Sequence, residues 1–115
     1  MEDRLIEILE SQGCPVLRQG SLGDNDYPET LITFWNDASD GHSFYDNTEY
    51  GVVWAYSVYV YSSNPSKIYS VMEDLINRFK TNKWIVKGHG YDVPSDVETH
   101  TGRGIHVFCL KMEEN

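Results

Sequence analysis

Basic residues are scarce in this chain of 115 residues. Nine lysines and arginines stand against eighteen aspartates and glutamates, which gives a formal net charge of −9 at pH 7. Proteins that bind nucleic acid usually need a basic patch to neutralise phosphates, and the basic residues here are scattered along the chain. The composition therefore argues against specific nucleic-acid binding, although an acidic surface would let DNA slide past without sticking.

Long hydrophobic runs and paired cysteines are also lacking. No apolar run approaches the roughly 20 residues of a membrane-spanning helix, and the N-terminal MEDRLIEILE has no signal-peptide core. We therefore expect no membrane association and synthesis in a cytosol. Cys14 and Cys109 lie far apart and outside any CxxC pair, which argues against structural zinc. A reducing cytosol disfavours a disulfide between them.

The hydrophobic and aromatic content of the chain is typical of a single folded domain. Hydrophobic residues make up 40% and aromatic residues 13% of the chain, enough for a conventional core with many aromatic side chains. We therefore predict a single domain over residues 1–115.

Two segments have the periodicity of amphipathic helices. In residues 2–12, Leu5, Ile8 and Leu9 share one face, and Gly13 and Pro15 end the segment. In the second segment, Asn64 can cap the N-terminus with Pro65 at the first helical position, and Asn82 can end the helix. Its apolar residues fall in one stripe that we assign to the core: Ile68, Val71, Met72, Leu75, Ile76 and Phe79.

Four segments have the composition of β-strands. They are Leu31–Asn36, Val52–Tyr61, Lys83–Lys87 and Gly104–Met112. The predicted order is helix, strand, strand, helix, strand, strand, with loops over Pro15–Glu29, Asp37–Gly51 and the residues after Lys87. This order predicts an α+β fold with a mainly antiparallel four-stranded sheet and two helices packed on one of its faces.

The strand Val52–Tyr61 has no conventionally polar face. One face carries valines, Trp54 and Tyr56, while the other carries Ala55, Ser57, Tyr59 and Tyr61. A sheet with one face in water normally alternates apolar and polar residues. Since only two helices are available to cover the sheet, we predict that Tyr59 and Tyr61 lie on a face that meets a partner.

The segment Gly88–His106 gathers residues with reactive side chains. A metal site could use its three histidines and its acidic residues: His89, His100, His106, Asp92, Asp96 and Glu98. No HxxxH or HExxH spacing supports this hypothesis. An acid–base pair drawn from Asp92, Asp96 and His100 stays open, because spacing within a loop says little about distance in space.

A phosphate-binding loop and a calcium site would each need a motif that this chain lacks. Gly102 and Gly104 flank Arg103, but phosphate-binding loops lie between a strand and a helix, and this stretch leads into a strand. We interpret both glycines as turn residues and Arg103 as the partner of a nearby carboxylate. The acidic loop Asp37–Glu49 lacks the ordered ligand positions of an EF-hand. Neither cysteine nor any serine has the neighbourhood of a catalytic nucleophile.

Several stretches of the chain resemble a known family of structural proteins. They are QGSL, YPETLITFWN, Tyr45-Asp46-Asn47, the strand Val52–Tyr61 from Trp54 onward with the Asn64-Pro65 that follows it, and KWIVKGHGYDVPSDVETHTGRGI. Together they are similar to small tail-completion, or head–tail joining, proteins of long-tailed phages and prophages of Gram-positive bacteria. The similarity runs from about Gln19 to the last strand.

The resemblance implies a non-enzymatic structural protein without a cofactor. Such a subunit assembles as a ring, as a hexamer, at the head-proximal end of the tail tube, and docks to the tube and the head connector. The expected location is the virion, with the host cytoplasm before assembly. In this hypothesis Asp96, His100 and Arg103 order the Gly88–His106 loop, and Tyr45 and Asp46 belong to the same set of assembly contacts.

Overall fold

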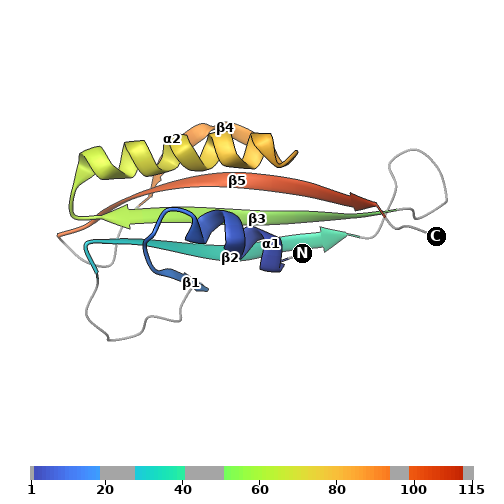
Figure 1. The fold of residues 1–115 in the computed structure, drawn as a ribbon, viewed down its shortest axis with the longest axis horizontal. Coiled ribbons are helices and arrows are strands. Elements are labelled where there is room, and N and C mark those ends of the chain that lie inside the picture. The colour runs from blue at the N-terminus through green and yellow to red at the C-terminus, as the bar shows by residue number, and fades with distance from the viewer. Residues whose placement is uncertain (1, 19–27, 41–50, 94–98, 113–115) are drawn as a thin grey trace.

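In a computed structural model, the chain forms two helices and one five-stranded sheet (Figure 1). The structure describes residues 2–18, 28–40, 51–93 and 99–112. In chain order the elements are α1 (Glu2–Glu10), β1 (Val16–Arg18), β2 (Thr30–Asp40), β3 (Gly51–Ser62), α2 (Pro65–Thr81), β4 (Ile85–Val93) and β5 (Thr101–Met112). The α+β class and the two helices are confirmed.

The sheet differs in detail from the four-stranded antiparallel prediction. Its strand order is β1-β2-β3-β5-β4, and β1 pairs parallel to β2, which makes the sheet mixed. The short strand β1 was missed, because Val16–Arg18 lies in a segment rich in glycine and aspartate that is typical of a loop. Ile32 N–H donates to the Pro15 carbonyl (2.9 Å), which extends this pairing to the chain before β1.

Strand β4 is longer than predicted. It runs from Ile85 to Val93, so the first residues of the expected Gly88–His106 loop belong to the sheet. Two glycines in this stretch are the reason that the sequence predicts a loop here. Gly88 and Gly90 have positive φ angles (74° and 108°) and form a bulge between the paired residues Lys87 and Tyr91.

Helix α2 begins and ends as the sequence predicts. The Asn64 side chain accepts a hydrogen bond from Ser66 N–H (3.1 Å), and Pro65 opens the helix. At the other end, Asn82 donates through its side-chain amide to the Arg78 carbonyl (2.8 Å). Lys83 then adopts a positive φ of 68°, the left-handed conformation that stops a helix.

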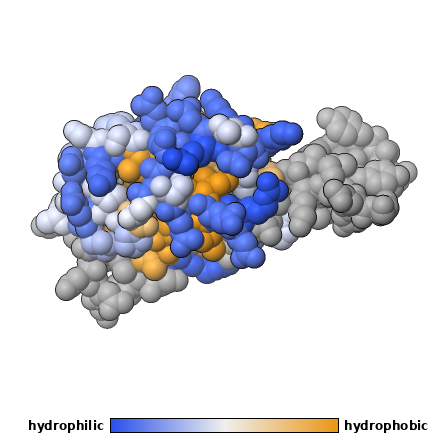
Figure 2. Space-filling view, viewed as in Figure 1, coloured by the Kyte–Doolittle hydropathy of each residue, from blue (hydrophilic) through white to orange (hydrophobic). Residues whose placement is uncertain are grey.

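The core lies between the two helices and one face of the sheet. All six apolar residues predicted for α2 are buried, and Leu5 and Leu9 of α1 join the same cluster. Alternate residues of the strands complete it, among them Ile32, Tyr56 and Val107. In the side shown in Figure 2, hydrophobic residues reach the surface in the centre and are framed by polar and charged ones. Because residues of α1 and α2 are buried in the same cluster as one face of the strands, both helices cover that face of the sheet.

Within the described residues, neither helix is long and apolar enough to cross a membrane.

The core generates the first prediction. Phe79 is fully buried and packs against Trp84, with ring centroids 5.4 Å apart. Phe79→Ala should lower the free energy of unfolding by about 3–5 kcal/mol, because it removes an aromatic ring and leaves a cavity. Asn77→Ala, an exposed position of the same helix, is the control and should change it by less than about 0.5 kcal/mol. Urea denaturation followed by circular dichroism measures both, and equal effects of the two substitutions would contradict this core.

Candidate functional site

The described reactive residues of the Gly88–His106 segment do not converge on one site. Asp92 lies on the helix-covered side, where it pairs with Arg103, whereas His106 lies on the opposite side of β5, across from Ser57 of β3. His89 and Asp92 are exposed and His100 is buried. Within the described residues, no three potential ligands are close enough to hold a metal ion. Asp96 and Glu98 lie outside those residues, as do Tyr45 and Asp46.

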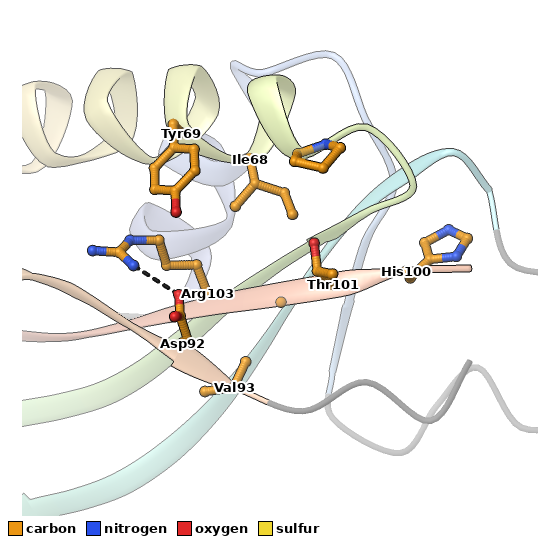
Figure 3. A pocket seen from close by; sticks show the side chains of 9 residues that line it. Ile68, Tyr69, Asp92, Val93, His100, Thr101 and Arg103 are labelled. Carbon is orange, nitrogen blue, oxygen red and sulfur yellow. Dashed lines mark hydrogen bonds and ion pairs between the residues drawn. The ribbon is translucent and has the colours of Figure 1, made fainter. Parts of the chain in front are cut away.

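Arg103 has three partners on the helix side of the sheet. Its Nη1 donates to Asp92 Oδ1 (2.9 Å) and its Nη2 donates to the Gly90 carbonyl (3.2 Å). The guanidinium carbon also lies 5.3 Å from the centroid of the Tyr69 ring, a cation–π distance. Figure 3 shows this arrangement beside a hollow of about 390 Å³ between α2 and the ends of β4 and β5. Arg103 thus ties the two strands to α2 and is not presented as a phosphate ligand.

His100 fastens the start of β5 to the segment before β2. Its Nε2 lies 2.8 Å from the Pro28 carbonyl, which can only accept, so Nε2 carries the proton. The other nitrogen, Nδ1, then accepts from the Thr99 hydroxyl (2.9 Å). Since both ring nitrogens are engaged and the residue is buried, His100 is placed to order the chain rather than to transfer protons.

Among the described residues, two of the three exposed aromatic side chains, Trp35 and Tyr91, lie on the face of the sheet opposite the helices. We call it the open face and define it by the side chains of four strands that point away from the core: Thr33, Trp35 and Asp37 of β2, Ser57, Tyr59 and Tyr61 of β3, His106 and Phe108 of β5, and Ile85, Lys87 and Tyr91 of β4. Trp35 is 52% exposed and Ile85 is 65% exposed. Tyr91 is exposed as well.

Two glycines shape the open face. In β5, Gly102 stands opposite Tyr61 and Gly104 stands opposite Tyr59, so these glycines are strand residues and the prediction that they form a turn is wrong. A Cβ on Gly102 would lie 2.6 Å from Cε1 of Tyr61, and one on Gly104 would lie 2.8 Å from Cδ1 of Tyr59. The glycines therefore give the two tyrosine rings room to lie flat across the neighbouring strand. This is why Tyr59 and Tyr61 are only partly exposed.

A polar network occupies the middle of the open face. The Ser57 hydroxyl donates to Asp37 Oδ2 (2.7 Å) and lies 3.0 Å from His106 Nδ1. On the far side of the imidazole, Nε2 lies 3.2 Å from the Tyr91 hydroxyl. The four side chains come from four different strands and link the face from β2 to β4.

This network contains the residue types of a hydrolase triad without its geometry. In a triad the serine and the carboxylate contact opposite nitrogens of the histidine, which then relays the proton. Here Ser57 and Asp37 both lie on the Nδ1 side, at 3.0 Å and 3.6 Å from that atom. Ser57 is only 2% exposed and already gives its proton to Asp37. The arrangement is suited to holding strands in register and not to activating a nucleophile.

Three ionisable side chains near these strands are held in their neutral forms. Partial burial, together with the neighbouring Tyr59 and Asp37, raises the pKa of Tyr91 to about 12. Burial also raises the pKa of the Cys14 and Cys109 thiols, which disfavours their reactive thiolate forms.

The predicted site residues that the structure describes fall into two groups, one on the open face and one around the start of β5. Tyr59 and Tyr61 share the open face, and their rings are 6.4 Å apart. Arg103 lies at the start of β5 and His100 lies directly before this strand, and each makes the contacts given above. Asp37, His106, Trp35 and Tyr91 are residues of the open face that the sequence did not assign to it. These residues come from three separate strands, β2, β5 and β4, so only the strand pairing could have brought the three strands' side chains together.

No protein-family model matches the chain, and no curated protein is significantly similar to it in sequence.

The close contact of Gly102 with Tyr61 is testable by substitution. Gly102→Ala should lower the free energy of unfolding by about 1–3 kcal/mol, because the new methyl group displaces a packed ring. In the Tyr61→Ala background the same substitution should cost clearly less. Gly88→Ala is the control, since its Cβ would meet open space and its cost comes from the positive φ alone. Thermal unfolding of the double-mutant cycle checks this, and strictly additive effects at 61 and 102 would contradict the contact.

The ionisation of Tyr91 gives a second test. Its folded pKa lies above the ordinary value of 10.0, so the folded state favours the neutral phenol. This contribution to stability is complete below pH 10 and is lost as the pH rises towards 12. Titration of tyrosinate absorbance should show a late phase that disappears in Tyr91→Phe and persists in Tyr69→Phe. A late phase retained in Tyr91→Phe would refute the assignment.

Proposed function

We propose that this chain is a virion structural protein of the phage head–tail interface, of the tail-completion or tail-terminator type. It acts by self-assembly into a ring, as a hexamer, and by docking to the tail tube and the head connector. It is not an enzyme, needs no cofactor and binds no nucleic acid specifically, although DNA passes through the ring. The resemblance described above supplies this role and these partners.

One observation carries the assembly part of the proposal, namely the open face. Trp35, Ile85 and Tyr91 are exposed together on a face that no described helix covers. Apolar and aromatic surface gathered on one side of a small protein marks an interaction site more often than a solvated surface. Tryptophan and tyrosine are also the residues that contribute most to binding energy at protein interfaces.

The polar network supports the same role. Asp37, Ser57, His106 and Tyr91 tie four strands together through their side chains, so the open face is ordered before any partner binds. A preorganised surface loses less conformational entropy on association. The acidic net charge agrees with a channel that DNA must cross without adhering.

A monomeric adaptor that binds another protein through the open face is the second candidate. The same exposed aromatic residues favour it, because the surface would serve a foreign partner as well as a second subunit. The two functions differ in whether the purified protein associates with itself. A small enzyme or metal-binding protein using the 88–106 segment is disfavoured by the separation of His100 and His106 onto different parts of the fold.

The open face predicts the effect of two matched substitutions. Trp35→Ser should weaken self-association about 30-fold or more, because an exposed tryptophan at an interface is worth about 2 kcal/mol or more. Tyr69→Ser is the control, since Tyr69 is 58% exposed but lies on α2, on the helix side. Size exclusion with light scattering over a concentration series measures both, and electron microscopy of the largest species shows whether rings form. A wild-type protein that stays monomeric alone and with tail-tube protein would contradict the assembly function and leave the adaptor.

A further inference from the structure

A groove runs between α2 and the strands β4 and β5, on the side of the sheet that the helices cover. It consists of two hollows of about 390 Å³ and 430 Å³, which meet at Tyr69 and Arg103. The helix wall of the groove runs from Pro65 to Lys80, about 22 Å along the axis of α2. An extended chain covers this length with about seven residues, because each residue advances it by about 3.3 Å. The groove therefore has the length of a short peptide, whereas a small molecule would fill only one of its hollows.

The groove has apolar walls and a polar rim. In the first hollow, Ile68 of α2 and Val93 of β4 supply the apolar walls, as Figure 3 shows. In the second hollow, Met72 and Ile76 of α2 do so, and both are buried. The exposed side chains of the rim follow one line along the helix: Tyr69, Glu73, Asn77 and Lys80. Ligand-binding sites usually have this form, with apolar walls and a few polar groups.

Arg103 brings unused hydrogen-bond donors to the point where the two hollows meet. A guanidinium has five N–H donors, of which Asp92 and the Gly90 carbonyl each accept one. Three donors therefore lack an acceptor among the described residues. The hydroxyls of Tyr69 and Thr101, which line the first hollow, also lack a hydrogen-bond partner in the described part of the chain. This end of the groove thus offers more donors than acceptors.

Asp92 shows that Arg103 takes a carboxylate at this point. One oxygen of Asp92 accepts from Arg103 Nη1 at 2.9 Å, and the Asp92 side chain is 85% exposed. An ion pair with so exposed a carboxylate holds its partners only weakly. The Arg103 side chain is itself 20% exposed, so its remaining donors are partly withdrawn from water. A carboxylate that arrives from outside can join or displace Asp92 and take two parallel N–H bonds from the guanidinium.

We propose that this groove binds an extended acidic segment of a partner protein. Alternate side chains of an extended segment point to the same side, so every second residue enters the groove. One apolar side chain fills the hollow between Ile68 and Val93, and the carboxylate two residues further on binds Arg103. The next apolar side chain covers Ile76, and a second carboxylate reaches Lys80.

The charges of the groove favour this occupant over other polymers. Arg103 and Lys80 supply two full positive charges, and the exposed imidazole of His89 adds an N–H donor between the strands and the helix. Glu73 lies on the rim of the second hollow, so an unbroken run of acidic residues would meet a like charge there. A nucleic acid, which has a phosphate at every nucleotide, would meet both Glu73 and Asp92. Carboxylates separated by apolar residues fit best.

The groove is separate from the open face, and this inference depends neither on self-association nor on a ring.

Three synthetic peptides test the preference of the groove. The probe is a fluorescein-labelled peptide LTDTLTD, whose leucines and aspartates share one side of an extended chain. The peptide LTNTLTN keeps the shape without the charge, and LTKTLTK reverses the charge. By fluorescence anisotropy, the wild-type protein should bind LTDTLTD about 10-fold or more tighter than LTNTLTN, because hydrogen bonds to charged groups are stronger than neutral ones. No binding of LTDTLTD, or equal binding of either other peptide, would overturn the proposal.

Two substitutions in the same ion pair should act in opposite directions. Arg103→Gln should weaken binding of LTDTLTD about 10-fold or more, because it removes the guanidinium. Asp92→Asn should tighten binding about threefold, because the competing carboxylate is gone. Asp74→Asn is the control, since it breaks the ion pair with Arg78 elsewhere on α2, and it should leave the affinity unchanged. If the pair of Arg103 and Asp92 served the fold alone, both substitutions would weaken binding, and that result would overturn the proposal.

Amide chemical shifts locate the bound peptide. Addition of LTDTLTD to isotope-labelled protein should shift the amides of Ile68, Thr101 and Arg103, while those of Trp35 and Ser57 on the open face stay unchanged. Shifts confined to the open face would overturn the groove as the site. Hexanoate, a free carboxylate with an apolar tail, should shift the groove amides only at far higher concentration, and equal affinity would overturn the peptide as the occupant. A wild-type protein that stays monomeric would contradict the assembly function and not this inference, so the two fail separately.

Discussion

The described part of the fold depends on one constraint: two helices cover one face of a five-stranded sheet, and within the described residues only side chains of the sheet itself lie on the other face. Strand β3 lies at its centre and pairs along its length with β2 and with β5. One side of β3 presents Tyr56, Val58 and Val60 to the core, where all three are fully buried. The other side presents Ser57, Tyr59 and Tyr61, which have no described helix above them. In the described part of the chain, side-chain contacts within the sheet stabilise this second face.

The open face achieves this in two ways. Tyrosine rings lie over the glycines of β5, which shields backbone that would otherwise face water. At the same time Ser57, Asp37, His106 and Tyr91 satisfy one another by hydrogen bonds. These contacts leave Trp35, Ile85 and Tyr91 at the margins, where they are available to another molecule. The side chains in the middle of the open face are thus bonded to one another, while those at its margins can contact another molecule, which suits a binding surface.

Much of the fold could be predicted from the sequence, because local signals and the final structure agree. The cap at Asn64, the helix end at Asn82 and the apolar stripe of α2 are set by neighbours in the chain, and they were predicted correctly. The strand β1 and the extension of β4 were not, because they lie in glycine-rich stretches that take up strand geometry only when a partner strand is present. Gly102 and Gly104 were misread for the same reason, since their role depends on tyrosines of a distant strand.

The candidate site was harder to predict than the fold. The residues that looked reactive as a cluster, His89, His100 and His106, are separated because they lie on different strands and strand ends, and alternate strand residues point to opposite faces. The residues that do meet, Asp37, Ser57 and His106, lie in separate strands, and only the register relates them. The side of the Val52–Tyr61 strand predicted to meet a partner does carry Tyr59 and Tyr61, but the most exposed residues of that face come from its neighbours.

The central claim is that the open face is the surface through which this protein associates. Hydroxyl-radical footprinting of the wild-type protein over a range of concentrations tests it most directly, since side-chain oxidation reports exposure residue by residue. We predict that Trp35 and Tyr91 become protected as association proceeds, while Tyr69 on the helix side stays equally reactive. Protection of Tyr69 with Trp35 and Tyr91 unchanged would contradict the claim.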